Sequence, residues 1–148
     1  MASAYRLSDR YFIHPSKRTT AGLWIAQPDF VSLPLEASPE ELGLAVVASL
    51  AQSTGVVPHP TVWTGLSKPR LAAAGFRSEK AFMQGAHLVS VALADTIILD
   101  PNHNGGTTGE QRGFTPLPDK RFIILPNSAP MVVGSELLAA FKACTNAA

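Results

Sequence analysis

The stretch from Asn102 to Phe122 constrains the fold more than any other part of the chain, because it is dense in glycine and proline. Its glycines and prolines are Gly105, Gly106, Gly109, Gly113, Pro116 and Pro118. The interior of a helix or a strand does not tolerate that density, so the sequence predicts a long shaped loop. Loops of this length in small domains are usually functional or disordered, and this one ends in an aromatic residue and a strand-like segment. We therefore interpret it as a surface that the protein uses.

Length and composition indicate one globular domain spanning residues 1–148. The hydrophobic content of 46% and the charged content of 16% are typical of a protein with an apolar core. A formal net charge of +1 provides no overall basic surface for a nucleic acid or an anionic membrane. Met1–Arg10 does not resemble a signal peptide, and the best apolar run, Leu42–Ala51, is too short to span a bilayer. We therefore expect a soluble cytoplasmic protein.

Capping signals predict the helices. Ser38, Pro39 and Glu41 stand at the spacing of a capping box with proline in the first turn, ahead of an apolar stripe. The other predicted helices are Lys68–Ala74, closed by Gly75; Glu79–Gly85, capped by Ser78; and Glu136–Ala143, capped by Ser135.

Short runs of β-branched and aromatic residues predict the strands. The first run, Tyr11–Ile13, should stop at Pro15, with Ser16–Thr20 as a hairpin connection. The others are Leu23–Ala26, the run through Phe30, Val31 and Leu33, a hairpin formed by Val89–Leu93 and Ile97–Leu99, and Arg121–Leu125. This order predicts an α+β fold with a mainly antiparallel sheet and helices packed on one side.

No residue pattern indicates a catalytic, cofactor or metal site. The four histidines do not stand at metal-ligand spacing, and no nucleophile elbow, Walker motif or dinucleotide-binding motif is present. We expect no catalytic residue, no cofactor and no metal. One alternative remains open, a small RNA-processing phosphodiesterase in which His103 is the base and Arg112 or Lys120 stabilises the transition state. A solvated turn is the favoured interpretation of His103.

Charged and aromatic side chains also suggest surfaces for binding another protein. Carboxylates in turns of the C-terminal half could form an acidic rim that mimics phosphate: Asp95, Asp100, Glu110 and Asp119. Trp24 and Trp63 could anchor a partner, although a core or half-buried packing role is favoured for both. Tyr5 and Tyr11, beside Arg6 and Arg10, are interpreted as a solvated N-terminal edge.

Several short motifs together resemble a known family. They are Tyr11–Ile13; Leu35 with Glu40, Glu41, Leu42 and Gly43; Val57–Pro60; Phe82 and Met83 before an apolar strand; and Gly105–Phe114 before Pro118, Asp119 and Lys120. In this order they resemble the immunity proteins of bacterial contact-dependent growth inhibition systems, and the similarity runs across most of the chain. An immunity protein that binds a basic nuclease would be expected to be strongly acidic. This chain departs from that expectation, because its formal net charge is +1.

The resemblance implies a small cytoplasmic inhibitor and not an enzyme. Proteins of this family bind the toxic C-terminal domain of a CdiA effector, commonly a nuclease that acts on transfer RNA, and block its active site or its RNA-binding face. The partner would be that toxin domain, with no direct contact to nucleic acid or membrane. The residues that bind the toxin are specific to each toxin, so they cannot be inferred from a motif of the family. The toxin-binding residues that we predict are therefore our own choice from the loop and its flanks: Asp100, His103, Glu110, Arg112, Asp119 and Lys120.

Overall fold

The computed structural model describes residues 1–147, which form a curled sheet with four α-helices. The strands are β1 (Ala2–Arg6), β2 (Arg10–Thr19), β3 (Trp24–Ala26), β4 (Val31–Pro34), β5 (Val56–Val57), β6 (His87–Leu93), β7 (Ile97–Asn104), β8 (Phe114–Pro116), β9 (Phe122–Ile124) and β10 (Thr145–Asn146). The helices are α1 (Pro39–Ala51), α2 (Lys68–Ala74), α3 (Glu79–Met83) and α4 (Pro130–Ala143), with a 3₁₀ turn, η1 (Pro118–Lys120).

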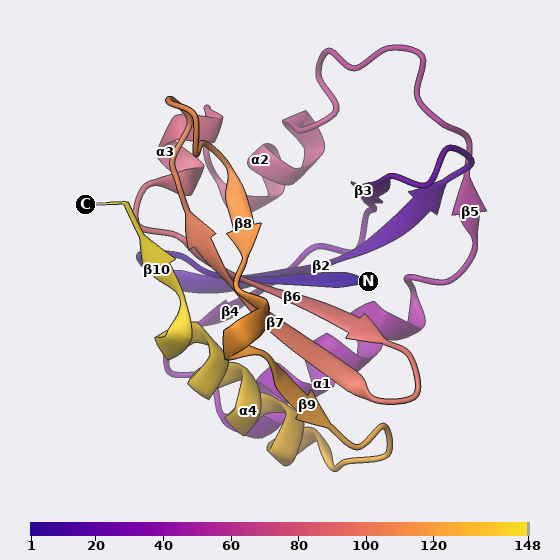
Figure 1. The fold of residues 1–148 in the computed structure, drawn as a ribbon, viewed down its shortest axis with the longest axis vertical. Helices are drawn as coiled ribbons and strands as arrows, with labels where there is room; N and C mark the ends of the chain where they lie inside the picture. The colour runs from indigo at the N-terminus through magenta and orange to yellow at the C-terminus, as the bar shows by residue number, and fades with distance from the viewer. Residues whose placement is uncertain (148) are drawn as a thin grey trace.

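The sheet is mainly antiparallel, as predicted. Its main path runs β10-β7-β6-β1-β2-β3, with β4 and β5 also paired to β2, and β8 and β9 also paired to β7 (Figure 1). Two short contacts are parallel, β10 with β7 and β5 with β2. The predicted hairpin is β6 and β7, in which Leu93 pairs with Ile97. The strand β1, which the sequence analysis did not predict, lies between β2 and β6 at the centre of the sheet.

Two prolines lie inside the long strands, and the prediction that a strand stops at Pro15 is wrong. The strand β2 pairs with β4 over residues 10–13 and with β3 over residues 16–18, so Pro15 falls where the neighbour changes. Pro101 has the same place in β7, between the segments paired with β9 and β8. The missing N–H of proline is tolerated at such a break in the ladder. As a consequence, Ser16–Thr19 is strand, and the predicted hairpin connection begins only at Thr20.

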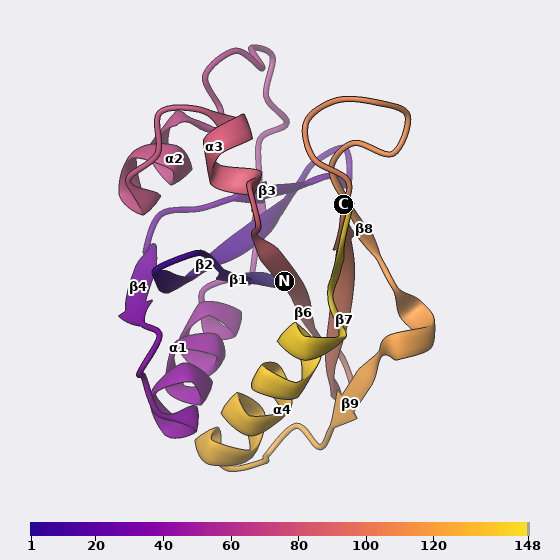
Figure 2. The same cartoon turned by 90° about the vertical axis from the view of Figure 1, so that its left-hand side faces the viewer.

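The sheet carries helices on both faces (Figure 2). The long helices α1 and α4 cover one face and enclose the larger core with side chains such as Leu42, Val46 and Leu137. The short helices α2 and α3 lie on the other face, over an aromatic cluster that includes Phe12 and Phe82. The predicted α+β class with its mainly antiparallel sheet is confirmed. The prediction that the helices pack on one side holds for α1 and α4, whereas α2 and α3 cover the aromatic cluster on the other face.

Glycine brings α1 and α4 into backbone contact at their N-terminal turns. A Cβ atom on Gly43 would lie 1.8 Å from the Pro130 carbonyl oxygen, and one on Gly134 would lie 1.6 Å from that of Pro39. Each proline occupies the first turn of its own helix, so each glycine faces the start of the other helix. The prediction that Ser135 caps the last helix is wrong, because α4 already begins at Pro130.

The other predicted caps are confirmed. The Ser38 hydroxyl accepts the Glu41 N–H at 3.2 Å, and the Ser78 hydroxyl accepts that of Ala81 at 3.1 Å. Gly75 closes α2 in the left-handed region, with φ of 84°. These interactions are local in sequence, which is why spacing alone could identify them.

Tyr5 and Tyr11 are buried, so their interpretation as a solvated N-terminal edge is wrong. Their strands occupy the middle of the sheet, and their side chains point to opposite faces. Tyr5 contacts Phe82 edge-to-face, with 4.9 Å between ring centroids, and Tyr11 stacks on Phe141 at 5.6 Å.

Candidate functional site

The glycine-rich segment is an ordered loop between β7 and β8, and it is shorter than the sequence predicts. Residues at both ends of the predicted stretch belong to strands, which leaves Gly105–Gly113 as the loop itself. Its neck is closed by two backbone hydrogen bonds, from Gly105 N–H to Gly113 O at 2.8 Å and from Gly113 N–H to Gly106 O at 2.7 Å. A Cβ atom on Gly105 would lie 1.6 Å from the Gln111 carbonyl oxygen, so only glycine permits this crossing. Figure 2 shows the loop projecting beyond the sheet.

Asn104 holds the loop against the rest of the domain. Its buried amide nitrogen donates to the carbonyl oxygens of Met83 at 2.6 Å and Ala86 at 2.9 Å, and its side-chain oxygen accepts the Gly106 N–H at 2.9 Å. One side chain therefore connects the end of α3, the start of β6 and the base of the loop. These hydrogen bonds constrain the position of the loop base, because a buried polar group of the Asn104 amide that lost its partner would cost free energy.

We expect Asn104→Ala to lower the free energy of unfolding by about 2 kcal/mol, because it removes three hydrogen bonds made by one buried side chain. Hydrogen exchange at the Gly106 amide should accelerate as the loop loses its anchor. Chemical denaturation and exchange measured by NMR would check both effects. Asn127→Ala, at an exposed turn, is the matched control and should change neither quantity. Unchanged exchange at Gly106 in Asn104→Ala would contradict this role.

The loop and α3 enclose a shallow cleft. Its volume is 480 Å³, and it is lined by Glu79, Met83, Gly106, Thr107, Arg112 and Gly113. Glu79 also forms an ion pair with Arg70, whose guanidinium lies over the Phe82 ring with 4.4 Å to the centroid. Glu79 and Met83 were not predicted as site residues, because only the tertiary contact through Asn104 brings α3 to the loop.

The predicted residues nearest the sheet already have partners within the chain. Asp100 accepts two hydrogen bonds from Arg121, at 2.7 Å from Nε and 2.9 Å from Nη2. This carboxylate raises the pKa of the Arg121 guanidinium. His103 Nδ1 lies 2.7 Å from the Thr145 hydroxyl, across the parallel contact between β7 and β10. Both residues belong to the strand β7, not to a turn.

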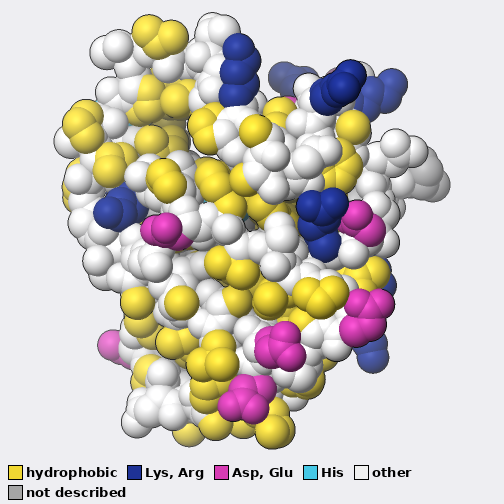
Figure 3. Space-filling model, turned by 180° about the vertical axis from the view of Figure 1, so that it is seen from behind, with side chains coloured by type: hydrophobic (Ala, Val, Ile, Leu, Met, Phe, Trp, Pro, Cys, Tyr) yellow, Lys and Arg dark blue, Asp and Glu magenta, His cyan; other side chains and the backbone are white. Residues whose placement is uncertain are grey.

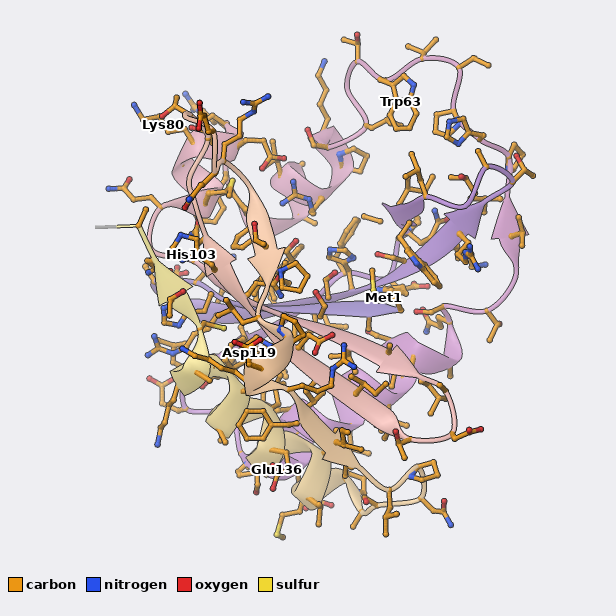
Figure 4. The ribbon with its side chains drawn as sticks, viewed as in Figure 1. Met1, Trp63, Lys80, His103, Asp119 and Glu136 are labelled. Atoms are coloured by element: carbon orange, nitrogen blue, oxygen red, sulfur yellow. The ribbon has the colours of Figure 1, made fainter. Side chains whose placement is uncertain are left out.

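The other four predicted residues are exposed, and they divide between two places. Glu110 and Arg112 lie on the loop, whereas Asp119 and Lys120 lie in or beside η1, at the opposite end of β8. His103 pairs with Thr115 in the middle of that strand, and Figure 4 shows His103 and Asp119 set apart along this edge. The structure therefore arranges the predicted residues in a row along the β7–β8 edge, and it does not gather His103, Arg112 and Lys120 in one cluster.

Neither tryptophan is a core residue, and both fit the half-buried part of the favoured interpretation. Trp24 is 41% exposed and Trp63 is 50% exposed. Trp63 lies in the connection between β5 and α2, which extends from the body of the domain (Figure 4). His59 packs edge-to-face on Trp63, with 5.2 Å between ring centroids, and its Nδ1 lies 2.8 Å from the Thr19 hydroxyl. Val62, Trp63 and Leu66 are exposed hydrophobic residues of this connection. Figure 3 shows that hydrophobic side chains are exposed over much of the face opposite to that of Figure 1.

Across residues 1–147, no three His, Cys, Asp or Glu side chains come together in a way that could hold a metal ion. Within the same range, no helix has the length and apolar character needed to cross a membrane. Cys144 ends α4 half-buried, and burial raises the pKa of its thiol.

The fold and the projecting loop define this chain as a single-domain α+β protein with a curled antiparallel sheet. No protein-family model and no curated protein matches the sequence.

Solved structures that share the fold include two that match nearly the whole chain. One is a protein of unknown function, NMB0488, from Neisseria meningitidis, with a TM-score of 0.74, 15% identity, and coverage of 97% of this chain and 93% of that one. The other is a chain of a CdiA-CT/CdiI toxin and immunity complex from Yersinia pseudotuberculosis, also with a TM-score of 0.74, at 16% identity, covering 97% of this chain and 96% of that one.

Proposed function

We propose that this protein is an immunity protein, which binds and neutralises the toxic C-terminal domain of a contact-dependent growth inhibition effector. The observation that carries the proposal is the match over nearly the whole chain to a structure from a toxin and immunity complex. The motifs in the sequence point to the same family independently of the fold. In this proposal the protein acts by binding in the cytoplasm and has no catalytic role.

The β7–β8 edge is the proposed toxin-binding surface. It presents an ordered loop with a constrained neck, and Glu110, Arg112, Asp119 and Lys120 are exposed there and form no ion pair among residues 1–147. Rigid loops bind with a smaller loss of conformational entropy than flexible ones. Because both signs of charge are present, we propose recognition by a mixed pattern of charges. A nuclease toxin would be inhibited by covering its active site or its RNA-binding face.

Co-expression with the toxin domain encoded immediately upstream tests the proposal. We expect the two proteins to co-purify, and growth that the toxin alone arrests should be restored. Failure of both binding and rescue would overturn the proposed function. Incubation of the purified protein with transfer RNA, beside His103→Ala, tests the phosphodiesterase alternative. Cleavage that is lost in the variant would favour the enzyme.

Charge reversal tests the proposed surface separately. We expect Glu110→Lys and Asp119→Lys each to weaken toxin binding about tenfold, because a like charge facing the partner costs on the order of 1–2 kcal/mol. Glu36→Lys is the matched control, an exposed carboxylate in the connection before α1. Titration calorimetry would give the affinities, and thermal unfolding should be unchanged in all three variants. If Glu110→Lys and Asp119→Lys both bind the toxin with unchanged affinity, the β7–β8 edge is not the interface.

A further inference from the structure

A second cleft lies between the sheet and the end of α4, away from the loop. Its volume is 320 Å³, which is within the range of small-molecule sites. The residues that line it are Arg6, Tyr11, His87, Leu138, Phe141 and Lys142. None of these residues was predicted from the sequence to bind a ligand.

Sheet register and helix periodicity bring these side chains together. Arg6 pairs with Tyr11 on β2 and with His87 on β6, so the three residues form one row across adjacent strands and share a face. That face is the one covered by α4, since Tyr11 belongs to the core beneath the long helices. Leu138 and Lys142 are one turn apart on α4 and therefore point to the same side, toward the row.

The chemistry of the cleft changes with depth. Its inner wall is apolar and aromatic, because Tyr11 and Phe141 are nearly fully buried and stack with 26° between their ring planes. Its rim carries Arg6, His87 and Lys142, of which Arg6 and Lys142 are exposed.

Among the described residues, no carboxylate forms an ion pair with the cations of this rim. None of the lining residues is acidic, and neither Arg6 nor Lys142 forms an ion pair among residues 1–147. Asp9, in the adjacent turn, is paired with Arg10. Like charges opposite one another in a sheet are unfavourable, and burial together with the nearby Arg6 guanidinium lowers the pKa of His87. Two cations without a counter-charge among residues 1–147, Arg6 and Lys142, at the rim of an apolar wall suit an anion with an apolar body.

We propose that this cleft binds an organic anion, whose ring or alkyl chain lies against Tyr11, Leu138 and Phe141 and whose carboxylate or phosphate group is held by Arg6 and Lys142. The guanidinium can donate two parallel hydrogen bonds to such a group, and the ammonium supplies a point charge. His87 would complete the rim as a hydrogen-bond donor. The proposal does not depend on toxin binding, because the cleft and the β7–β8 edge have no lining residue in common.

NMR titration of the full chain tests the proposal with two probes, phenyl phosphate and 3-phenylpropionate, and with uncharged benzyl alcohol as the reference. We expect saturable shifts confined to amides near residues 6, 87 and 138–142, and no saturation with benzyl alcohol. Arg6→Gln and Lys142→Gln should each weaken binding about tenfold, the usual effect of removing one charge-assisted hydrogen bond. Lys80→Gln, a lysine on α3 beside the loop, is the matched control and should bind as the wild type does.

The two probes distinguish the possible head groups. Saturation by both supports a site for oxyanions in general, and saturation by one alone supports the proposal and assigns the head group. Linear or scattered shifts with both probes would overturn it. Equal binding by Arg6→Gln, Lys142→Gln and the wild type would also overturn it, provided that circular dichroism shows that both variants are folded.

Discussion

Alanine at Gly43 or Gly134 is expected to lower the free energy of unfolding by about 3 kcal/mol or more, at the upper end of the cost of overpacking. At an ordinary helical site the same change stabilises by about 1 kcal/mol, because alanine is the better helix former. Here the added methyl would overlap a carbonyl oxygen of the other helix, at 1.8 Å for Gly43 and 1.6 Å for Gly134. A backbone carbonyl cannot rotate away as a side chain can, so α1 and α4 would have to separate.

Chemical denaturation of the two glycine variants would measure this effect. Ser135→Ala is the matched control, since it adds no bulk to an exposed position next to Gly134 on the same helix. It should leave stability unchanged or slightly higher. If Gly134→Ala is as stable as Ser135→Ala, the close crossing of the two helices is incorrect. The double variant should lose less than the sum of the two single losses, because helices moved apart by one substitution leave room for the other.

Acidification is expected to destabilise the protein through His14 by about 3 kcal/mol between pH 6.5 and pH 4. The imidazole is 3% exposed, between Tyr5 and Phe30, and burial lowers its pKa to about 4. Its Nδ1 donates to the Pro15 carbonyl oxygen at 2.9 Å, whereas Nε2 has no hydrogen-bond partner among residues 1–147. A proton on Nε2 would therefore be a buried charge without compensation.

The sign follows from proton binding by the two states. Below pH 6.5 the unfolded chain protonates His14 while the folded chain does not, so stability is complete above pH 6.5 and falls as the pH approaches 4. In His14→Phe this contribution should vanish. The difference in stability between variant and wild type at pH 8 reports packing alone and serves as the control. If that difference is the same at pH 4.5 as at pH 8, His14 does not titrate as its burial implies.

Features that are local in sequence were predictable. The capping residues Ser38 and Ser78, the closing glycine Gly75 and the β6–β7 hairpin depend on neighbours a few residues away, and each is present in the structure. Where an interaction comes from a distant segment, the predictions failed. Pro15 is a valid stop signal for an isolated strand, but here two different neighbours pair on either side of it.

The candidate site shows the same division. Composition located the loop, because glycine density reports backbone conformation directly. The anchoring of its base depends on Asn104, whose partners Met83 and Ala86 are 21 and 18 residues away. The partial exposure of Trp63 could not be predicted either. An aromatic residue beside apolar neighbours in the sequence is compatible with a core or a half-buried position until the path of the chain is known.

The sequence by itself determined the α+β class, the positions of three helix caps and the place of the glycine-rich loop, because these depend on local backbone preference and on the total apolar content. Only the tertiary structure decided which residues share a face: the row of Tyr11, Arg6 and His87 exists because three strands meet in one register. The close contact of α1 with α4 was decided in the same way, since Gly43 and Gly134 are far apart in the chain. Register and helix crossing result from burying many side chains at once, and no local stretch of sequence contains that information.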